Sequence, residues 1–128
     1  MSYSLGGAST IKLGLAHPDL QTVVKTAISI TDVDFSVVET ERSKEQQRIN
    51  IRNGVSWTMD SDHIPDENGE VKAADIYPWV DGETSHDREH YKRVAKAMFS
   101  SAQQHGIKIE WGGFWAGKRE DMPHWALT

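Results

Sequence analysis

The hydrophobic pattern in the first part of the chain predicts a helix, a strand and a second helix. Apolar residues recur with a helical period after Pro18, which suits the first turn of a helix. The β-branched stretch from Phe35 to Thr40 predicts a strand, and residues 43–46 form a capping-box pattern that opens a helix ending at Gly54. Arg42 therefore lies at a strand-to-helix junction. The periodic apolar positions of the first helix are Leu20, Val23, Val24, Ala27 and Ile28.

The middle of the chain alternates between irregular and regular segments. Residues 55–82 are broken by proline and glycine, with a short apolar strand expected at 73–77. Residues 84–87 offer caps for a third and longest helix, which Gly106 should end. The apolar positions of that helix are Tyr91, Val94, Ala95, Met98, Phe99 and Ala102.

The last part of the chain predicts two further strands. Apolar and charged residues alternate over 107–111, and a short extended piece over 124–127 follows the break at Gly112 and Gly113. Helices and strands are mixed without a regular alternation, which favours an α+β fold. The 128 residues, 38% of them apolar, predict one domain over 1–128 with a core of its own.

Charge and cysteine content narrow the classes of function. The formal net charge is −5 and there is no run of Lys or Arg, which argues against a nucleic-acid partner. The chain has no cysteine, so any metal must be bound by histidine and carboxylate. The N-terminus lacks the features of a signal peptide, and no apolar run approaches about 18 residues. We therefore expect synthesis in the cytoplasm and no membrane anchor.

Residues that can bind a metal are scattered along the chain from residue 63 onward. His63, Asp75 and His124 are the donor types of an open zinc site, whose free position holds a water with a pKa of about 7. Asp121 lies close enough in sequence to His124 to accept a proton from that water. This set of residue types points to a hydrolase.

Five segments together resemble the VanY-type zinc peptidases, and more narrowly the L-alanyl-D-glutamate endopeptidases of bacteriophage endolysins and bacterial cell-wall hydrolases. The resemblance runs from about residue 15 to the C-terminus. It rests on Glu41-Arg42-Ser43-Lys44-Glu45-Gln46, Ser61-Asp62-His63, Ala73-Ala74-Asp75-Ile76, Trp111-Gly112-Gly113 and Asp121-Met122-Pro123-His124-Trp125.

The resemblance implies a fold and roles for particular residues. The fold would be a small hedgehog/D-Ala-D-Ala-peptidase-like domain, with a central antiparallel sheet flanked by about three helices. His63, Asp75 and His124 would bind zinc, and Asp121 would be the general base. The roles implied for the remaining two matches are substrate binding or oxyanion stabilisation for Arg42, and a less defined catalytic role for Ser61.

The spacing of the ligands departs from the family pattern. His63 and Asp75 are twelve positions apart, further than in the family, and the polar segment 65–70 looks like an inserted turn. Glu70 stands at the family spacing and is the alternative ligand, but the residues around Asp75 match the expected context. The insert itself reads as a solvated turn, with a weak cation site as the alternative.

Other residues invite interpretations that we weigh against simpler ones. Residues 86–90 fit the H-x-x-E-H pattern of another zinc peptidase class, yet a solvated helix start explains them better. His17 and His105 lie at helix ends and receive no chemistry. Five tryptophans are expected in two settings: Trp111, Trp115 and Trp125 as core or cleft wall, and Trp57 and Trp79 as possible lining of a substrate groove.

The resemblance implies a zinc metallopeptidase that hydrolyses the L-alanyl-D-glutamate bond of the peptidoglycan stem peptide. The expected setting is a monomeric phage endolysin, made in the host cytoplasm and released by a holin to degrade the wall in the periplasm, with antimicrobial effect. Two alternatives stay open. One is a D-alanyl-D-alanine carboxypeptidase, and the other is a non-catalytic wall-binding module stabilised by zinc.

Overall fold

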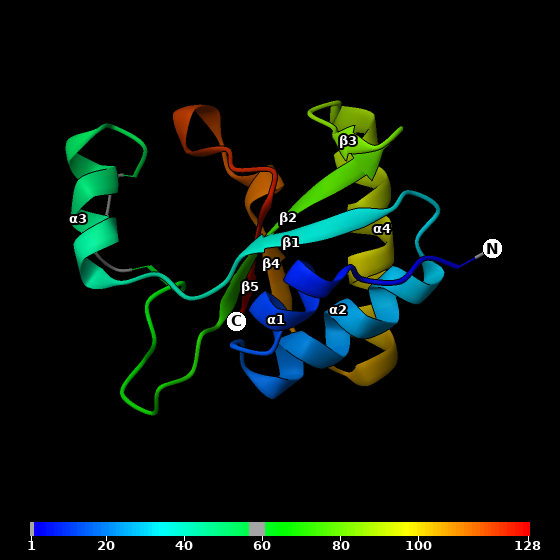
Figure 1. Cartoon of the computed structure of the whole chain (residues 1–128), viewed down its shortest axis with the longest axis horizontal. Coiled ribbons are helices and arrows are strands. Elements are labelled where there is room, and N and C mark those ends of the chain that lie inside the picture. Colours follow the sequence, from blue (N-terminus) through cyan, green and yellow to red (C-terminus); the bar gives the residue numbers. More distant parts are fainter. Residues whose placement is uncertain (1, 57–60) are drawn as a thin grey trace.

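A computed structural model describes residues 2–56 and 61–128 of the chain. Within them, four α-helices and five strands are ordered as drawn in Figure 1, with two 3-10 turns, η1 and η2, before the last strand. The helices are α1 (Gly7–Leu13), α2 (Pro18–Ile30), α3 (Lys44–Arg52) and α4 (Arg88–His105). The strands are β1 (Phe35–Glu39), β2 (Ala73–Val80), β3 (Glu83–Thr84), β4 (Ile109–Trp111) and β5 (His124–Leu127), and the turns are η1 (Gly112–Phe114) and η2 (Gly117–Arg119).

The strands form one antiparallel sheet in the order β1-β2-β5-β4, which confirms the expected α+β fold with a central antiparallel sheet. β3 extends the end of β2 as a short hairpin. Asp81 and Gly82 both have positive φ there, as a two-residue hairpin turn of the I′ type requires. The two strands at the centre, β2 and β5, are distant in sequence and adjacent in space.

One hydrophobic core is shared by the described residues. α2 packs along α4, and both helices contact the same sheet, while α1 covers β1 (Figure 1). The alternation of β2 places Ala74 and Ile76 in this core and turns Asp75 to the other face. The larger members of the core are Leu13, Leu20, Phe35, Ile76, Met98, Trp111 and Trp125.

The helix boundaries follow the predicted capping residues. The Ser43 hydroxyl accepts a hydrogen bond from the Gln46 amide at 3.0 Å, and the Asp87 carboxylate accepts one from Glu89 at 2.9 Å. Gly106 ends α4 in the left-handed conformation, with φ of 67°. These contacts confirm the expected ends of α3 and α4 to within two residues.

The sequence pattern missed α1 and β3. The α1 segment GASTIKL buries only Ser9 and Leu13, so it carries no apolar stripe long enough to be recognised. The two residues of β3 are too few for any alternation. Two predicted strands also differ in length, because β2 continues to Val80 and β4 begins at Ile109.

A β-bulge in β1 changes which side chains face the site. Val37 pairs with Ile76, but the next pair is Glu39 with Asp75, so two steps on β1 match one step on β2. The extra residue, Val38, is exposed. Without the bulge Glu39 would share the core face of Val37; with it, Glu39 lies opposite Asp75.

Candidate metal centre and its cleft

Strand pairing brings the first two candidate ligands together. Asp75 in β2 and His124 in β5 are direct partners in the antiparallel register, so their side chains share one face of the sheet. Their chain neighbours Ala74 and Trp125 turn to the opposite face and belong to the core. The small and fully buried Ala126 lies on the same face of β5 as His124.

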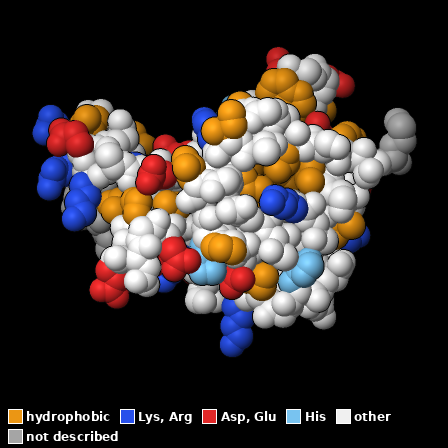
Figure 2. Space-filling model, turned by 60° about the horizontal axis from the view of Figure 1, so that its bottom comes forward, with side chains coloured by type: hydrophobic (Ala, Val, Ile, Leu, Met, Phe, Trp, Pro, Cys, Tyr) orange, Lys and Arg blue, Asp and Glu red, His pale blue; other side chains and the backbone are white. Residues whose placement is uncertain are grey.

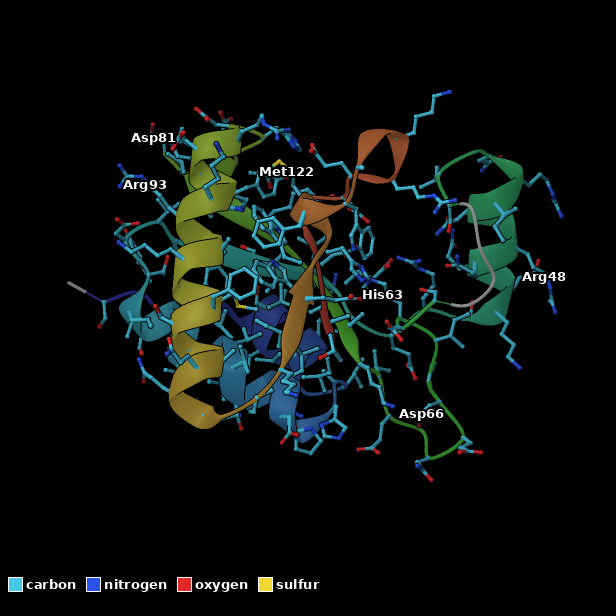
Figure 3. The ribbon with its side chains drawn as sticks, turned by 180° about the vertical axis from the view of Figure 1, so that it is seen from behind. Arg48, His63, Asp66, Asp81, Arg93 and Met122 are labelled. Carbon is cyan, nitrogen blue, oxygen red and sulfur yellow. The ribbon has the colours of Figure 1, made fainter. Side chains whose placement is uncertain are left out.

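The third candidate ligand, His63, reaches this face from the loop that precedes β2 (Figure 3). Its Nδ1 lies 2.8 Å from the Thr40 carbonyl oxygen, and its own carbonyl accepts a hydrogen bond from the Arg42 amide at 2.7 Å. A carbonyl oxygen only accepts, so Nδ1 carries the proton, and Nε2 of the neutral ring is left with its lone pair. His63 is 1% exposed, which makes this orientation hard to relax.

Three ligand atoms converge at the spacing of a tetrahedral metal site. His63 Nε2 lies 3.1 Å from Asp75 Oδ1 and 3.3 Å from His124 Nδ1, and His124 Nδ1 lies 3.6 Å from Asp75 Oδ1. Zinc bonds of about 2.0–2.1 Å place tetrahedral ligand atoms about 3.3–3.4 Å apart. The three residues therefore fit a zinc ion as a group.

The electrostatics of the cluster also suit a cation. Burial alone would raise the pKa of Asp75, but its contacts with His124 and His63 outweigh burial and hold that pKa well below the usual range. Burial likewise opposes the charged form of His63, and the hydrogen bond and negative charge of Asp75 nevertheless raise its pKa. Asp75 thus stays ionised. A cation placed between the three ligand atoms would be the natural partner for their lone pairs.

Asp121 is held beside the cluster by a tight turn. Its amide donates to the Gly112 carbonyl at 2.9 Å, and its carbonyl accepts from the His124 amide at 3.1 Å. The indole of Trp111 donates to the Met122 carbonyl at 2.6 Å and fixes the same turn. Burial, followed by the negative charge of Asp75, raises the pKa of Asp121, as suits a general base.

The two glycines of the Trp111-Gly112-Gly113 motif make this packing possible. A Cβ on Gly112 would lie 2.2 Å from the Asp121 carbonyl oxygen, and one on Gly113 would lie 2.4 Å from the Trp111 ring. Neither position leaves room for a side chain. The motif is therefore a steric requirement of the turn that carries Asp121.

Arg42 is fixed by a fork of polar contacts. Its Nε donates to Glu39 at 2.8 Å, its Nη2 also bonds Glu39, and its Nη1 donates to Gln47 at 2.6 Å. The guanidinium is 3.9 Å from the second oxygen of Asp75 and only 12% exposed. A positive charge therefore lies next to the three candidate ligands without competing for the Asp75 oxygen that faces the histidines.

A cleft of about 460 Å³ opens over these residues. His63, Asp75 and His124 line it together with Arg42 and Asp121. Further lining comes from Ser61, Tyr77, Trp115 and Lys118. The Trp115 ring lies 5.0 Å from the His124 ring, which makes it a wall of the cleft next to the metal cluster.

Comparison with known proteins decides the family. A family profile described as phage L-alanyl-D-glutamate peptidase matches residues 1–124. The chain belongs to this family. The L-alanyl-D-glutamate peptidase of Escherichia phage T5 is 31% identical over 116 residues, which cover 90% of this chain and 83% of that protein.

Two further family relatives agree. A Listeria phage L-alanyl-D-glutamate peptidase is 33% identical over 92 residues, covering 72% of this chain and 30% of that longer protein. The crystal structure of the Serratia marcescens L-Ala D-Glu endopeptidase ChiX matches with a TM-score of 0.87 and 34% identity, covering 98% of this chain and 90% of that one. The peptidase fold expected from the sequence is thereby confirmed.

The other predicted residues take different places. Glu70, the alternative ligand, pairs with His17 at 3.1 Å and lies outside the metal cluster. In the 86–90 motif, His90 Nδ1 lies 2.6 Å from the Ser85 hydroxyl, and His86 contacts the Tyr77 ring. Among the described residues, the one group that could hold a metal ion does not include these histidines.

The tryptophans divide between core and surface. Trp111 and Trp125 stack in the core with ring centroids 5.5 Å apart, and Trp115 lines the cleft. Trp79 pairs with Thr84 at the far end of β2 and is 41% exposed, and the described lining of the cleft does not include it. Trp57 lies outside the described residues.

Sequence reasoning overlooked Glu39, Gln47 and Tyr77. Glu39 and Gln47 hold Arg42, and Tyr77 lines the cleft two residues after Asp75. The alternation of β2 contains the signal for Tyr77, since it shares the face of Asp75. The bulge that turns Glu39 toward the site leaves no comparable signal in the sequence.

Proposed function

We propose that this chain is a zinc-dependent endopeptidase that hydrolyses the L-alanyl-D-glutamate bond of peptidoglycan stem peptides. The observation that carries the proposal is the convergence of His63, Asp75 and His124 at tetrahedral spacing in a chain of this peptidase family. The names of its relatives from Escherichia phage T5 and Serratia marcescens describe peptidases specific for L-alanyl-D-glutamate, which supports the choice of bond. The whole of 1–128 would act as one peptidase domain, in keeping with its shared core.

The three ligands would bind the ion in a fixed arrangement. His63 and His124 would contribute neutral nitrogens and Asp75 one carboxylate oxygen. The bond from His63 Nδ1 to the Thr40 carbonyl would hold the imidazole in the correct tautomer, as metal-bound histidines require. When bound, zinc supplies a Lewis acid that activates water and polarises the scissile carbonyl.

Asp121 and Arg42 would share the remaining chemistry. Asp121, with its raised pKa, accepts the proton of the attacking water and delivers it to the leaving amine. The Arg42 guanidinium, held by Glu39 and Gln47, donates to the oxyanion that develops on the carbonyl oxygen. Ser61, whose hydroxyl accepts from the His63 amide at 3.3 Å, helps to hold the loop of that ligand.

The biological setting we propose is lysis of a bacterial host by a phage endolysin. The endolysin would act as a monomer, accumulate in the host cytoplasm and reach the periplasmic peptidoglycan after release by a holin, with antimicrobial effect. Among the described helices, none has the length and apolar character to cross a bilayer. Names of relatives from two phages support this setting.

The test is mass spectrometry of purified Gram-negative peptidoglycan after incubation with the protein, with and without a zinc chelator. Chelator-sensitive release of peptides with a new D-glutamate amino terminus is the expected result. Release of free D-alanine would instead identify a D-alanyl-D-alanine carboxypeptidase. Intact stem peptides together with unfolding on chelation would indicate the wall-binding alternative.

A variant separates the base from the ligands. Asp121→Asn should keep stoichiometric zinc, because Asp121 lies outside the three-residue cluster, and should lose hydrolysis. Zinc content by atomic absorption and product release by chromatography are measured on the same sample. Loss of the metal in this variant would make Asp121 a ligand and overturn its assignment as the base.

A further inference from the structure

A second cleft adjoins the metal centre on the side of the inserted turn. Its volume is about 460 Å³, equal to that of the first cleft. Ser61 and Asp62 line both, so the two clefts meet at the residues just before His63. The second cleft is therefore within reach of a peptide bound over His63, Asp75 and His124.

Charges of opposite sign line this second cleft from two different elements. Lys44 and Arg48 come from α3, whereas Asp62, Asp66 and Glu70 come from the loop before β2. Figure 3 shows Arg48 and Asp66 on these two elements at the same end of the molecule, and Figure 2 shows charged side chains of both signs around α3. The cleft thus presents a cationic wall on α3 and a mainly acidic wall on the loop, where Lys72 also lines the cleft but is paired with Asp66.

Hydrogen bonds and ion pairs hold the acidic loop in a defined conformation. The Asp66 carboxylate accepts from the amides of Asn68 and Glu70 at 2.9 and 3.0 Å, and it pairs with Lys72 at 3.4 Å. Glu70 pairs with His17, and Val71 forms a bridge with Ala16. These contacts fix the loop against the body of the protein, so its charges are placed before any ligand arrives.

Some charges in this cleft remain available for a ligand. Within the described residues Lys44 and Asp62 have no ion pair, and Arg48 shares only a 3.6 Å contact with its exposed helix neighbour Glu45. Such an exposed pair contributes little and is readily exchanged. The cleft can therefore offer cations to a carboxylate and Asp62 to an ammonium group.

We propose that this second cleft binds a zwitterionic side-chain end of the stem peptide. The proposal rests on the proposed function. In stem peptides a diamino acid follows D-glutamate, and its side chain ends in an amine alone, as in lysine, or in an amine with a carboxyl group, as in diaminopimelate. Lys44 and Arg48 would bind that carboxylate, and Asp62 the ammonium. The two cations of α3 would thus make the enzyme selective for the diaminopimelate type.

The test compares cleavage of L-Ala-γ-D-Glu-meso-diaminopimelate with that of L-Ala-γ-D-Glu-L-Lys by the zinc-loaded full chain. We expect kcat/KM to favour the diaminopimelate peptide by about tenfold or more, as a charge-assisted contact made by one peptide alone predicts. The double variant Lys44→Gln with Arg48→Gln should lose this preference while cleaving the lysine peptide at the wild-type rate. Asp62→Asn should slow both peptides, since both carry the ammonium.

Arg52→Gln is the matched control, because Arg52 ends the same helix and is outside the described lining of the cleft. It should keep the wild-type preference. Equal wild-type rates for the two peptides, or a preference that persists in the double variant, would overturn the proposal. Cleavage of neither peptide would refute the proposed function, and calorimetric binding of the same two peptides would then decide the subsite by itself.

Discussion

The candidate metal site has two halves that are built in different ways. Asp75 and His124 belong to paired strands, and the ladder between β2 and β5 alone sets their distance. His63 and Arg42 lie outside the sheet. A hydrogen bond to the Thr40 carbonyl orients the His63 ring, and hydrogen bonds to the His63 carbonyl, Glu39 and Gln47 position Arg42. One half depends on register and the other on a few polar contacts.

The difference concerns stability as much as geometry. The sheet half is backed by the stacked rings of Trp111 and Trp125, so opening it requires disruption of the core. The loop half is held by contacts that contribute about 1 kcal/mol each. The sheet half is therefore a permanent scaffold, and the loop half completes the site.

Replacing each of the two histidine ligands in turn should have the largest effects on metal binding and activity. It should also show the difference in stability between the sheet half and the loop half. His124→Ala and His63→Ala should both lose bound metal and all measurable activity, because neither leaves three ligands. His63→Ala should also lower the free energy of unfolding by about 1–3 kcal/mol more than the other variant, since the buried Thr40 carbonyl loses its partner. Chemical denaturation of both metal-free proteins measures this. Equal destabilisation would remove the distinction between the halves.

Arg42→Ala should be next in size and act on turnover alone. The variant should bind one equivalent of zinc and lose about 100- to 1000-fold in kcat, as expected for removal of an oxyanion donor. The test is to measure kcat on a defined stem peptide and the zinc content of the same protein sample. Arg52→Ala, on the exposed end of α3, is the control and should retain full activity. An active Arg42→Ala variant would exclude Arg42 from the chemistry.

Gly112→Ala should disturb the sheet half through its attached turn. The new Cβ would overlap the Asp121 carbonyl oxygen, so the turn must shift, at a cost of about 1–3 kcal/mol for an overpacked site. A displaced Asp121 should lower kcat by up to about 100-fold. Gly7→Ala is the control, because a Cβ there meets no atom within 4 Å. The unfolding temperature and kcat should both fall in Gly112→Ala. Neither should change in Gly7→Ala.

Glu39→Gln should have a smaller effect, confined to the loop half. The amide keeps one acceptor for Arg42 but removes the charge of the fork, so kcat should fall by about tenfold, as for partners one step removed from the chemistry. The exposed neighbour Glu41→Gln serves for comparison. If zinc affinity fell while kcat held, Glu39 would act on the metal rather than on Arg42.

The smallest effect is expected at the H-x-x-E-H motif. His90→Ala should change kcat and zinc content by less than about twofold, within the scatter of surface substitutions. His90 contacts Ser85 at the start of α4 and takes no part in the metal cluster. If the His90→Ala protein bound less zinc than the wild type, the H-x-x-E-H motif would have to be a second zinc site.

The sequence was sufficient for the sheet half and only partly for the loop half. The helical period located α2 and α4, because each buries a regular apolar face. A short apolar stretch located β2, and a short extended piece after the glycine break located β5. Asp75 and Glu70 remained competing ligands until strand pairing placed Asp75 opposite His124. The contacts of Arg42 with Glu39 and Gln47 depend on a bulge and on tertiary packing, which leave no periodic trace.

The bulge at Val38 makes the site depend on the register of this strand. Deleting Val38 would remove the extra residue and leave Glu39 opposite Asp75. If the strand instead lost the bulge at unchanged length, Val38 would pair with Asp75 and the Glu39 carboxylate would enter the apolar core, so Arg42 would lose its anchor without any change in its own codon. A one-residue deletion at the bulge is therefore milder for the site than a substitution that forces regular pairing there.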